Sequence, residues 1–289
     1  MSNLSHLPRN GHVVNISSVP DLSPFRYPGG KTWLVPHIRH WIASQSARPA
    51  EFFEPFAGGG IVSLTVASEQ LADHITMVEL DWGVAAVWRT ILNGDSKWLV
   101  DRITRFDLTT RTVEVALARR AQSLRERAFQ TILKNRVNRG GILAPGAGRL
   151  KQGENGKGLH SRWYPQTLCK RILDIVSIRD RITFIQGDGL EILRQNAQYT
   201  NAMFFIDPPY TVAGKKAGSR LYAYHALDHE ELFRLTARLS GDFLMTYDDA
   251  EEVRDLAQQY KFDMRTIPMK NTHHAKMTEL LIGRDLHWI

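Results

Sequence analysis

The sequence predicts an α/β fold with a doubly wound mixed sheet, interrupted by an inserted, mainly helical and basic segment. Apolar strand-like runs alternate with helix-like spacing between residues 51 and 94, and the same alternation resumes after residue 181. The stretch between them is rich in Lys, Arg and Gly and lacks this alternation. Alternating strand and helix patterns are typical of a doubly wound sheet with helices on both faces.

The first half of the alternation begins with "EFFEPFAGGG" (51–60), a short apolar strand that runs into glycines. "IVSLTVASEQLA" has helical spacing, "HITMVELD" (74–81) is a second strand, and "VAAVWRTILNG" is a helix ending near Gly94. Residues 1–20 have little periodicity, and we expect a loose arm there.

The second half begins with a strand at 181–188 and a helix at 189–197. "AMFFIDPP" then provides a strand, and Asp228 is placed to cap a helix over about 228–240. The remaining expected elements are a strand in "DFLMTYDD", a helix at 249–260, and strands near 262–270 and 277–285. The sequence therefore predicts a core formed by residues 21–100 and 182–289, with residues 101–181 inserted between its two parts.

Composition is that of an ordinary globular protein, with 43% hydrophobic and 23% charged residues in 289. The single cysteine, Cys169, excludes an intramolecular disulfide and fits a reducing compartment. The amino terminus does not have the pattern of a secretory signal, and no apolar run is long enough for a membrane span. We therefore expect a soluble, cytoplasmic protein with no membrane partner.

The basic charge is concentrated in one internal segment. Residues 111–181 contain 16 Lys and Arg against 5 Asp and Glu, a balance of +11, whereas the rest of the chain has a balance of −4. Such a patch suggests a polyanionic partner, with nucleic acid the leading candidate. For "ARRAQSLRER" taken alone, a solvated helix face is an equally simple interpretation.

The strand in "NAMFFIDPPY" ends abruptly. Neither Pro208 nor Pro209 can donate an N–H to a sheet ladder, so the strand must stop before them. Asp207 and Tyr210 are thereby left on a rigid edge at the carboxyl end of a buried strand. This placement predicts a functional site.

"FAGGG", between a strand and a helix, is an arrangement that suits a nucleotide-like ligand, because glycine allows close approach and the helix start has free N–H groups. The next strand ends in Glu79 and Asp81, where a carboxylate could accept the hydroxyls of a ribose. Asp188, at the end of the strand at 181–188, is placed to meet the edge of an adenine ring. Glycines followed by acids at successive strand ends predict a nucleoside-containing cofactor.

"RYPGGKTW" (26–33) shares "GGKT" with phosphate-binding P-loops, but Phe25 stands where such a loop needs glycine and no strand precedes it. A phosphate loop is therefore disfavoured. Lys31 is instead placed as a cation at a helix start that could reach a ligand carboxylate.

Together these stretches resemble the Dam-type DNA adenine methyltransferases, which are S-adenosylmethionine-dependent and carry the DPPY motif. The resemblance runs from Phe25 to Asp285 and rests on "RYPGGK", "FEPFAGGG", "VELD", "GDG" and "FIDPPY" in this order. "LKNRVNRGGILAPGAGR", "LDHEELFRL" and "TELLIG" are further similar stretches. The resemblance implies a sheet of the S-adenosylmethionine-dependent methyltransferase type, a catalytic core in two parts, and a DNA target-recognition domain at 101–181.

The resemblance also implies S-adenosyl-L-methionine as methyl donor and double-stranded DNA as substrate. The implied cofactor-binding residues are Tyr27, Lys31, Glu54, Phe56, Gly58, Gly60, Glu79, Asp188 and Asp207. Lys31 would lie near the cofactor carboxylate, and Glu54, Phe56, Gly58 and Gly60 would form the wall on its methionine side. The family more often has Asp-Ile-Asn where this chain has Glu79-Leu80-Asp81, so Glu79 and Asp81 both stay open as the ribose ligand. "TYDD" (246–249) replaces the usual Ser-Asn, which leaves the role of that position open.

The DPPY motif suits methylation of an adenine amino group, which is a poor nucleophile. The implied catalytic residues are Asp207, Pro208, Pro209 and Tyr210. The Asp207 carboxylate and the Pro208 carbonyl would accept hydrogen bonds from the amino group and orient its lone pair. The base must leave the duplex to reach this edge, and Tyr210 would stack on it. The chemistry requires no metal ion, and the histidines are not accompanied by other residues in the spacing of a metal site.

The inserted segment is expected to contact DNA, through phosphates and through one or two arginines that read guanine edges. "AGKKAGSR" (213–220) is either a DNA-contacting loop or a plain surface loop. The candidate DNA-binding residues are Lys134, Arg136, Arg139, Arg149, Lys151, Asn155, Lys157, Lys215 and Lys216.

Other functions fit the sequence less well. Methylation of a cytosine amino group or of RNA is the nearest alternative, but Asp before PPY in this motif order favours adenine. A catalytically idle DNA-binding protein is disfavoured by the intact Asp207 and Tyr210, and a dinucleotide oxidoreductase by the incomplete G-x-G-x-x-G register. The biological setting is either a restriction–modification system, with a cognate endonuclease or second methyltransferase as partner, or a solitary methylase. Family likeness implies a monomer.

Overall fold

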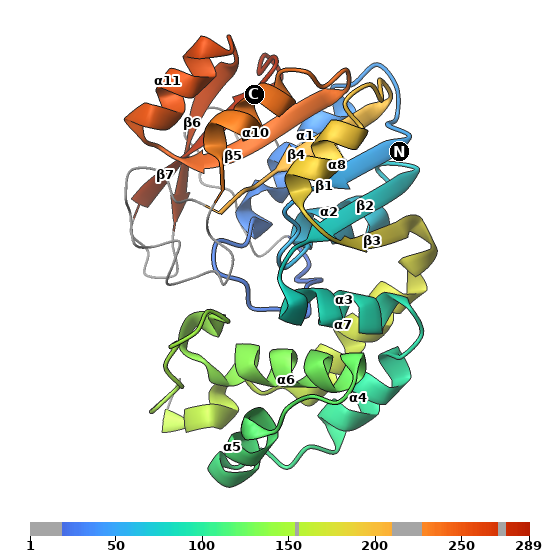
Figure 1. Cartoon of the computed structure of the whole chain (residues 1–289), viewed down its shortest axis with the longest axis vertical. Coiled ribbons are helices and arrows are strands. Elements are labelled where there is room, and N and C mark those ends of the chain that lie inside the picture. Colours follow the sequence, from blue (N-terminus) through green and yellow to red (C-terminus); the bar gives the residue numbers. More distant parts are fainter. Residues whose placement is uncertain (1–18, 154–155, 210–226, 271–275) are drawn as a thin grey trace.

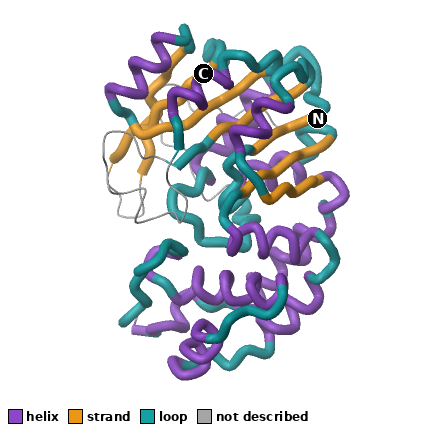
Figure 2. The backbone as a smooth tube through the Cα atoms, viewed as in Figure 1, coloured by secondary structure: helices purple, strands orange, loops and turns teal. Residues whose placement is uncertain are grey.

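A seven-stranded sheet forms the centre of the protein (Figures 1 and 2). The computed structural model describes residues 19–153, 156–209, 227–270 and 276–289. The sheet has the strand order β3-β2-β1-β4-β5-β7-β6. The strands are β1 Glu51–Glu54, β2 His74–Glu79, β3 Ile182–Gln186, β4 Ala202–Ile206, β5 Asp242–Asp248, β6 Asp263–Lys270 and β7 Lys276–Gly283. The predicted loose arm at 1–20 lies, except for its last two residues, outside the described part of the chain.

The sheet is mixed and doubly wound, as the sequence predicts. Strands β1 to β5 are parallel, whereas β7 runs antiparallel to both β5 and β6. The strand order reverses between β1 and β4, and in doubly wound sheets ligands bind outside the carboxyl ends of the strands at such a reversal. The predicted site residue Asp207 directly follows β4, at this position.

Strand β4 is buried along its whole length, which explains why its sequence "AMFFI" is uniformly apolar. Phe204 stacks on Phe53 of β1, with ring centroids 4.8 Å apart. Asp207, Pro208 and Pro209 follow the strand and are not part of it. The two prolines therefore end β4 as expected from their missing N–H groups.

Three of the helices that pack on the sheet begin at an aspartate that follows a strand or loop. Asp81, Asp188 and Asp228 each accept a backbone N–H from the first turn, which satisfies donors that a helix start leaves unpaired. The predicted capping role of Asp228 is thus confirmed. The helices of this part are α1 Val35–Ala43, α2 Ile61–Ser68, α3 Trp82–Leu92, α8 Gly189–Gln195, α10 His229–Thr236 and α11 Glu251–Gln259.

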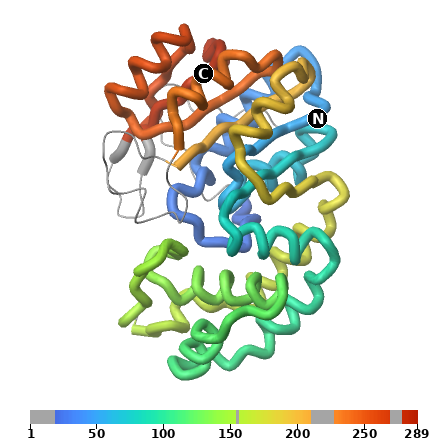
Figure 3. Tube along the Cα trace, viewed as in Figure 1, coloured from blue at the N-terminus to red at the C-terminus, as the bar shows by residue number. Residues whose placement is uncertain are grey.

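The segment between the two halves of the sheet is mainly helical over its described residues, with a glycine-rich loop near residues 142–153. It contains α4 Ser96–Thr104, α5 Thr110–Ala118, α6 Leu124–Val137 and α7 Pro165–Ser177, with the 3-10 turns η3 Arg139–Gly141 and η5 Gly158–Arg162. This green to yellow part of the chain lies to one side of the sheet, and α3 lies between the sheet and α6 (Figures 1 and 3). Arg149 forms a single antiparallel bridge with Asn138, so the glycine-rich loop folds back on the end of α6. Whether residues 101–181 are a recognition domain stays a prediction.

None of the helices in the described ranges combines the length and the apolar character that crossing a bilayer requires.

The central strand gives a direct test of the core. Replacing Phe204 by Ala removes a fully buried ring that stacks on Phe53, and we expect it to lower the free energy of unfolding by about 3–5 kcal/mol. Urea unfolding of the purified protein measures this change. The matched control is Leu173→Ala on α7, where the side chain is 52% exposed and the change should be small. Equal effects of the two substitutions would contradict the described position of β4.

Candidate active site

The glycine turn after β1 is pressed against the ring of Tyr27. A Cβ at Gly58 would lie 2.6 Å from Tyr27 Cε1, and one at Gly59 would lie 2.8 Å from Tyr27 Cβ. Gly60 has a φ of +64°, and a Cβ there would meet Met77 Cε at 2.5 Å. The first two glycines therefore allow Tyr27 to approach the turn, whereas Gly60 makes room for the core beneath it. This brings together two stretches, "RYPGGK" and "FAGGG", that the sequence analysis treated separately.

Glu54 ends β1 and is buried, with 3% of its surface exposed. Its Oε2 accepts the backbone N–H of Ser63 in the first turn of α2, at 3.0 Å. Burial raises the pKa of Glu54 to about 8, although the hydrogen bonds from Ser63 act in the opposite direction. Asp207 and Lys31 also act on this carboxyl electrostatically, so Glu54 lies in the same site as the DPP motif.

Glu79 and Asp81, which the sequence does not rank as ribose ligands, have different local partners. Glu79 accepts the N–H of Gly58 at 2.9 Å and the N–H of Asp81 at 2.8 Å, and burial raises its pKa to about 7. Asp81 instead accepts the N–H groups of Gly83 and Val84 and caps α3. Glu79 therefore faces the glycine turn, whereas Asp81 is used by the helix. The role of Glu79 as ribose ligand stays a prediction.

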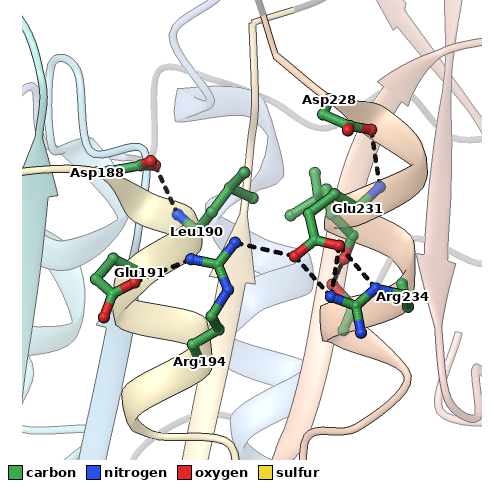
Figure 4. Close-up of polar contacts among 9 residues, drawn as sticks. Asp188, Leu190, Glu191, Arg194, Asp228, Glu231 and Arg234 are labelled. Carbon is green, nitrogen blue, oxygen red and sulfur yellow. Dashed lines mark hydrogen bonds and ion pairs between the residues drawn. The ribbon is translucent and has the colours of Figure 1, made fainter.

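Asp188 begins α8 and accepts the N–H of Leu190 at 2.9 Å (Figure 4). Its side chain is exposed, which leaves carboxylate oxygen available beyond the cap. A Cβ at the next residue, Gly189, would lie 2.4 Å from the carbonyl oxygen of Pro55 and 3.0 Å from the ring of Phe56. The glycine in "GDG" thus allows α8 to pack on the segment after β1, which places Phe56 next to Asp188.

The last turn of α8 is held to α10 by an exposed ion-pair network (Figure 4). Arg194 contacts Glu191 in its own helix and Glu231 in α10, both at 2.9 Å, and Arg234 contacts the same Glu231. Exposed pairs of this kind contribute little individually. Their place on the outer helices indicates a structural role and no direct part in the site.

The DPP motif has its carboxylate held by two side chains from other parts of the chain. Oδ1 of Asp207 lies 2.9 Å from the Nζ atom of Lys31 and accepts the hydroxyl of Thr246 at 2.8 Å. Lys31 also donates to the carbonyl oxygen of Gly29 at 3.0 Å and is only 3% exposed. The carboxylate is therefore fixed in direction before any ligand binds.

Two further acids face the Lys31 ammonium. Glu279 of β7 has its Oε1 at 3.7 Å from Nζ, and Asp248 of β5 pairs with Glu279 in the sheet register. Burial by itself lowers the pKa of Lys31, but the charges of Asp207, Glu279 and Asp248 outweigh it and raise that pKa. Burial raises the pKa of Glu279 to about 7. One cation is thus placed among three acids at the carboxyl ends of β4 and β5.

Sequence reasoning did not assign roles to Thr246 and Glu279. Thr246 lies in "TYDD", where the family usually has Ser-Asn, and its hydroxyl contacts Asp207. Glu279 lies in "TELLIG", where an acid precedes the three apolar residues of a buried strand. The sequence can show that an acid lies within an apolar strand, but it does not show which residue pairs with that acid.

The candidate DNA-binding residues of the inserted segment are placed in different surroundings. Arg139, Arg149, Lys151 and Lys157 are exposed. Lys134 donates to the carbonyl oxygen of Leu143, and Arg136, 6% exposed, donates to that of Pro24. Tyr210, Asn155, Lys215 and Lys216 lie outside the described residues. A role in catalysis for Tyr210, and in DNA binding for each of the other residues, stays a prediction.

Asn135 of α6 ties the inserted segment to the segment that carries Tyr27 and Lys31. Its side chain accepts the N–H of Arg26 at 2.9 Å and donates to the carbonyl oxygens of Arg26 at 3.0 Å and Gly141 at 2.7 Å. Gly141 has a φ of +75°, and a Cβ there would lie 2.2 Å from the Arg26 carbonyl oxygen. Asn135 therefore fixes the loop before the site from the side of the insert.

Comparison with known proteins agrees with this geometry over the amino-terminal part of the site. Residues 27–79 match the D12 class N6 adenine-specific DNA methyltransferase family. The match confirms the resemblance for the stretch that contains Tyr27, Lys31, Glu54 and the glycine turn. Together with the mixed sheet it supports a methyltransferase, and this class of enzyme uses S-adenosylmethionine as its methyl donor. No curated protein matches the sequence.

Solved structures with a similar chain path are distant. A Pyrococcus horikoshii protein assigned as an RNA methyltransferase has 10% identity and a TM-score of 0.40, and the alignment covers 90% of this chain and 84% of that chain. Precorrin-6y C5,15-methyltransferase from Geobacter metallireducens has 8% identity and a TM-score of 0.34, with coverages of 86% and 84%.

The buried Glu54 predicts a pH dependence of stability. Its pKa rises from 4.5 to about 8 on folding, so its contribution to stability is fully present below pH 4.5 and is lost as the pH rises through about 8. A Glu54→Gln variant lacks this loss. We therefore expect the variant to gain stability relative to wild type between about pH 5 and about pH 9, by about 1.4 kcal/mol for each unit of pKa shift that is realised.

Urea unfolding at both pH values measures the difference. Because Glu79 and Glu279 are present in both proteins, their own contributions cancel in the comparison. Glu114→Gln, at an exposed position of α5, is the control and should show no relative change with pH. A constant difference between Glu54→Gln and wild type across this range would contradict the raised pKa.

Proposed function

We propose that this protein is a sequence-specific DNA adenine methyltransferase. It transfers the methyl group of S-adenosylmethionine to the exocyclic amino group of an adenine flipped out of double-stranded DNA. The observation that carries the proposal is the DPP motif at the carboxyl end of β4, with the Asp207 carboxylate oriented by Lys31 and Thr246. The family match over residues 27–79 supports the same reaction.

The chemistry follows from what an adenine amino group lacks. Its lone pair is delocalised into the ring, so the nitrogen attacks a methyl group only if that lone pair is localised and aimed. The Asp207 carboxylate accepts one N–H and the Pro208 carbonyl the other, which favours a tetrahedral nitrogen. Because the prolines fix the backbone and Lys31 fixes the carboxylate, both acceptors are preorganised and need little rearrangement in the transition state.

The charge of the site suits the proposed methyl donor, whose sulfonium is cationic. Glu54, Asp207, Asp248 and Glu279 lie around the buried ammonium of Lys31, so a further positive charge is stabilised when these acids are ionised. The turn of Gly58 to Gly60, with Tyr27 against it, would hold the methionine part. Glu79 would accept the ribose hydroxyls, and Asp188 beside Phe56 would meet the adenine ring.

The DNA would be held by the inserted segment. Its exposed basic residues Arg139, Arg149, Lys151 and Lys157 follow the end of α6, and Asn135 fixes that end to the segment that carries Lys31. Phosphate contacts would position the duplex, and an arginine at a guanine edge would supply specificity. Tyr210 would stack on the extruded base. We propose that the protein acts as a cytoplasmic monomer, in a restriction–modification system or as a solitary methylase.

The reaction is tested by sequencing modified bases in genomic DNA from a methylation-free host that expresses the protein. We expect methylated adenine in one short motif for wild type. Methylated cytosine in place of adenine would move the chemistry to the other exocyclic amino group, and the absence of any mark on DNA would contradict the proposal.

Asp207→Asn should abolish this mark, with a loss of at least roughly 10²-fold in the transfer rate, because the amide cannot accept hydrogen bonds as a carboxylate does. Binding of S-adenosylmethionine, measured by calorimetry, checks that the cofactor site is intact. Asp249→Asn, which removes an exposed acid paired with Arg254, is the matched control and should keep full transfer. An Asp207→Asn variant with the wild-type rate would refute the proposed role of the motif.

The insert is tested by the salt dependence of DNA binding. We expect Arg149→Ala and Lys151→Ala each to weaken binding and, for a phosphate contact, to reduce the slope of log K against log salt by about one unit. Fluorescence anisotropy with a duplex of the motif found by sequencing measures this slope. Lys97→Ala, in α4 outside the glycine-rich loop, is the control with an unchanged slope. Unchanged slopes for both loop variants would place the DNA elsewhere.

A further inference from the structure

Three glutamates lie at the proposed site, Glu54 and Glu279 buried and Glu79 half-buried, and they differ in how their carboxyl oxygens are satisfied. Glu54 accepts the N–H of Ser63, and Glu79 accepts those of Gly58 and Asp81. Glu279 is buried like Glu54, but its Oε2 has no hydrogen-bond partner among the described residues. Buried polar atoms are nearly always hydrogen-bonded, so an unpartnered carboxyl oxygen indicates a group kept for function.

Glu279 is connected to Asp207 through Lys31. The Nζ atom of Lys31 lies 2.9 Å from Oδ1 of Asp207 and 3.7 Å from Oε1 of Glu279. The ammonium is therefore located between the carboxylate that would touch the substrate, at the end of β4, and the carboxyl group of Glu279 on β7, two strands further along the sheet. The other charged group facing Glu279 from the described elements is Asp248 of β5, its partner in the register.

The proposed reaction must dispose of a proton. The amino nitrogen forms a bond to the methyl carbon, the carbon–sulfur bond breaks, and its electron pair stays on sulfur, which becomes a neutral thioether. The nitrogen then carries a positive charge and loses one N–H proton to become a neutral methylamine. Asp207 is the adjacent base, but a proton retained there would neutralise the carboxylate that the next substrate needs.

We propose that Glu279 is a positioning residue that holds Lys31 against Asp207 and takes up, through Lys31, the proton released by methylation. This proposal rests on the proposed function. Asp207 accepts the proton from the methylated nitrogen. Lys31 gives one of its own protons to Glu279, and the amine lone pair that this frees takes the proton from Asp207. Asp207 is again a carboxylate, Lys31 is again an ammonium, and Glu279 has become a carboxylic acid, so charge and protons balance.

The surroundings of Glu279 suit this role. Burial raises its pKa to about 7, which is near the pH at which a group can both accept and release a proton efficiently. Lys31 acts in the opposite direction, whereas Asp207 and Asp248 raise the pKa further. A proton that leaves Asp207 therefore reaches a carboxylate with a higher affinity for it than an exposed glutamate has.

Single-turnover methyl transfer, measured against pH with wild-type protein and a duplex that contains its motif, tests the proposal. We expect the rate to fall on the acid side of an apparent pKa near 7, because Glu279 must be ionised to take the proton. This decrease in rate at low pH is the acid limb of the profile. In Glu279→Gln the rate should fall by roughly 10²-fold, and the acid limb should disappear because Gln does not titrate. Glu279→Asp, which keeps a carboxylate, should restore the limb at a displaced pH.

The matched control is Asp249→Asn, which removes an exposed acid that follows β5 and pairs with Arg254, and it should keep the fall in rate at low pH that wild type shows. Binding of S-adenosylmethionine and thermal melting establish that each variant is folded. If Glu279→Gln does not fold, the Glu279→Asp variant is the test. An acid limb at the same pH in Glu279→Asp as in wild type would contradict the role of Glu279. Wild type without an acid limb, or Glu279→Gln that retains it, overturns the inference. Wild type that transfers no methyl group to DNA overturns the proposed function itself.

Discussion

The ion pairing of the buried Lys31 ammonium is the interaction on which the arrangement of the site depends. It joins a segment near the amino terminus to the carboxyl ends of β4 and β5 and to β7. A charge that is buried this completely must be paired, and removal of one partner from a buried pair typically costs about 3–5 kcal/mol. The glycines that pack against Tyr27 and the hydrogen bonds of Asn135 to Arg26 fix the position of the segment that carries Lys31. Lys31 in turn sets the direction of the Asp207 carboxylate.

The same constraint explains why acids accumulate at this edge of the sheet. Carboxyl ends of parallel strands converge, and each strand that ends here contributes one or two acidic side chains. In water such a group of like charges would be dispersed by repulsion, but here burial and the one ammonium control how many of the acids are ionised near neutral pH. The acids of the site therefore titrate together near neutral pH, and their protonation is a property of the whole set of acids rather than of any one residue.

Sequence patterns predicted the architecture well because strand and helix signals are local. The strand ended by Pro208, the glycine turn and the cap at Asp228 each follow from a few neighbouring residues. The contacts within the site are different, because Lys31, Asp207 and Glu279 are separated by many residues and meet only through the strand order. Thr246 was visible as a departure from the family pattern, but its hydrogen bond to Asp207 depends on the pairing of β5 with β4. The prediction for Arg136 treated it like its exposed neighbours, whereas its guanidinium lies inside the protein and burial lowers its pKa to about 10.

The hydrogen bonds between the Asn135 side chain and the Arg26 backbone have a consequence for the evolution of such proteins. The peptide group of Arg26 is held on both its N–H and its carbonyl side by one amide from the insert, and the next residue along the chain is Tyr27. An insert transplanted from a relative with a different DNA target would have to supply an amide at this position and a glycine at Gly141, or the loop before the glycine turn would lose its anchor. Under the proposed function, the segment for target specificity and the segment for cofactor binding are thus held together by one side chain and could not be exchanged independently. New specificities would be expected to arise by substitution within the glycine-rich loop, with the end of α6 kept in place.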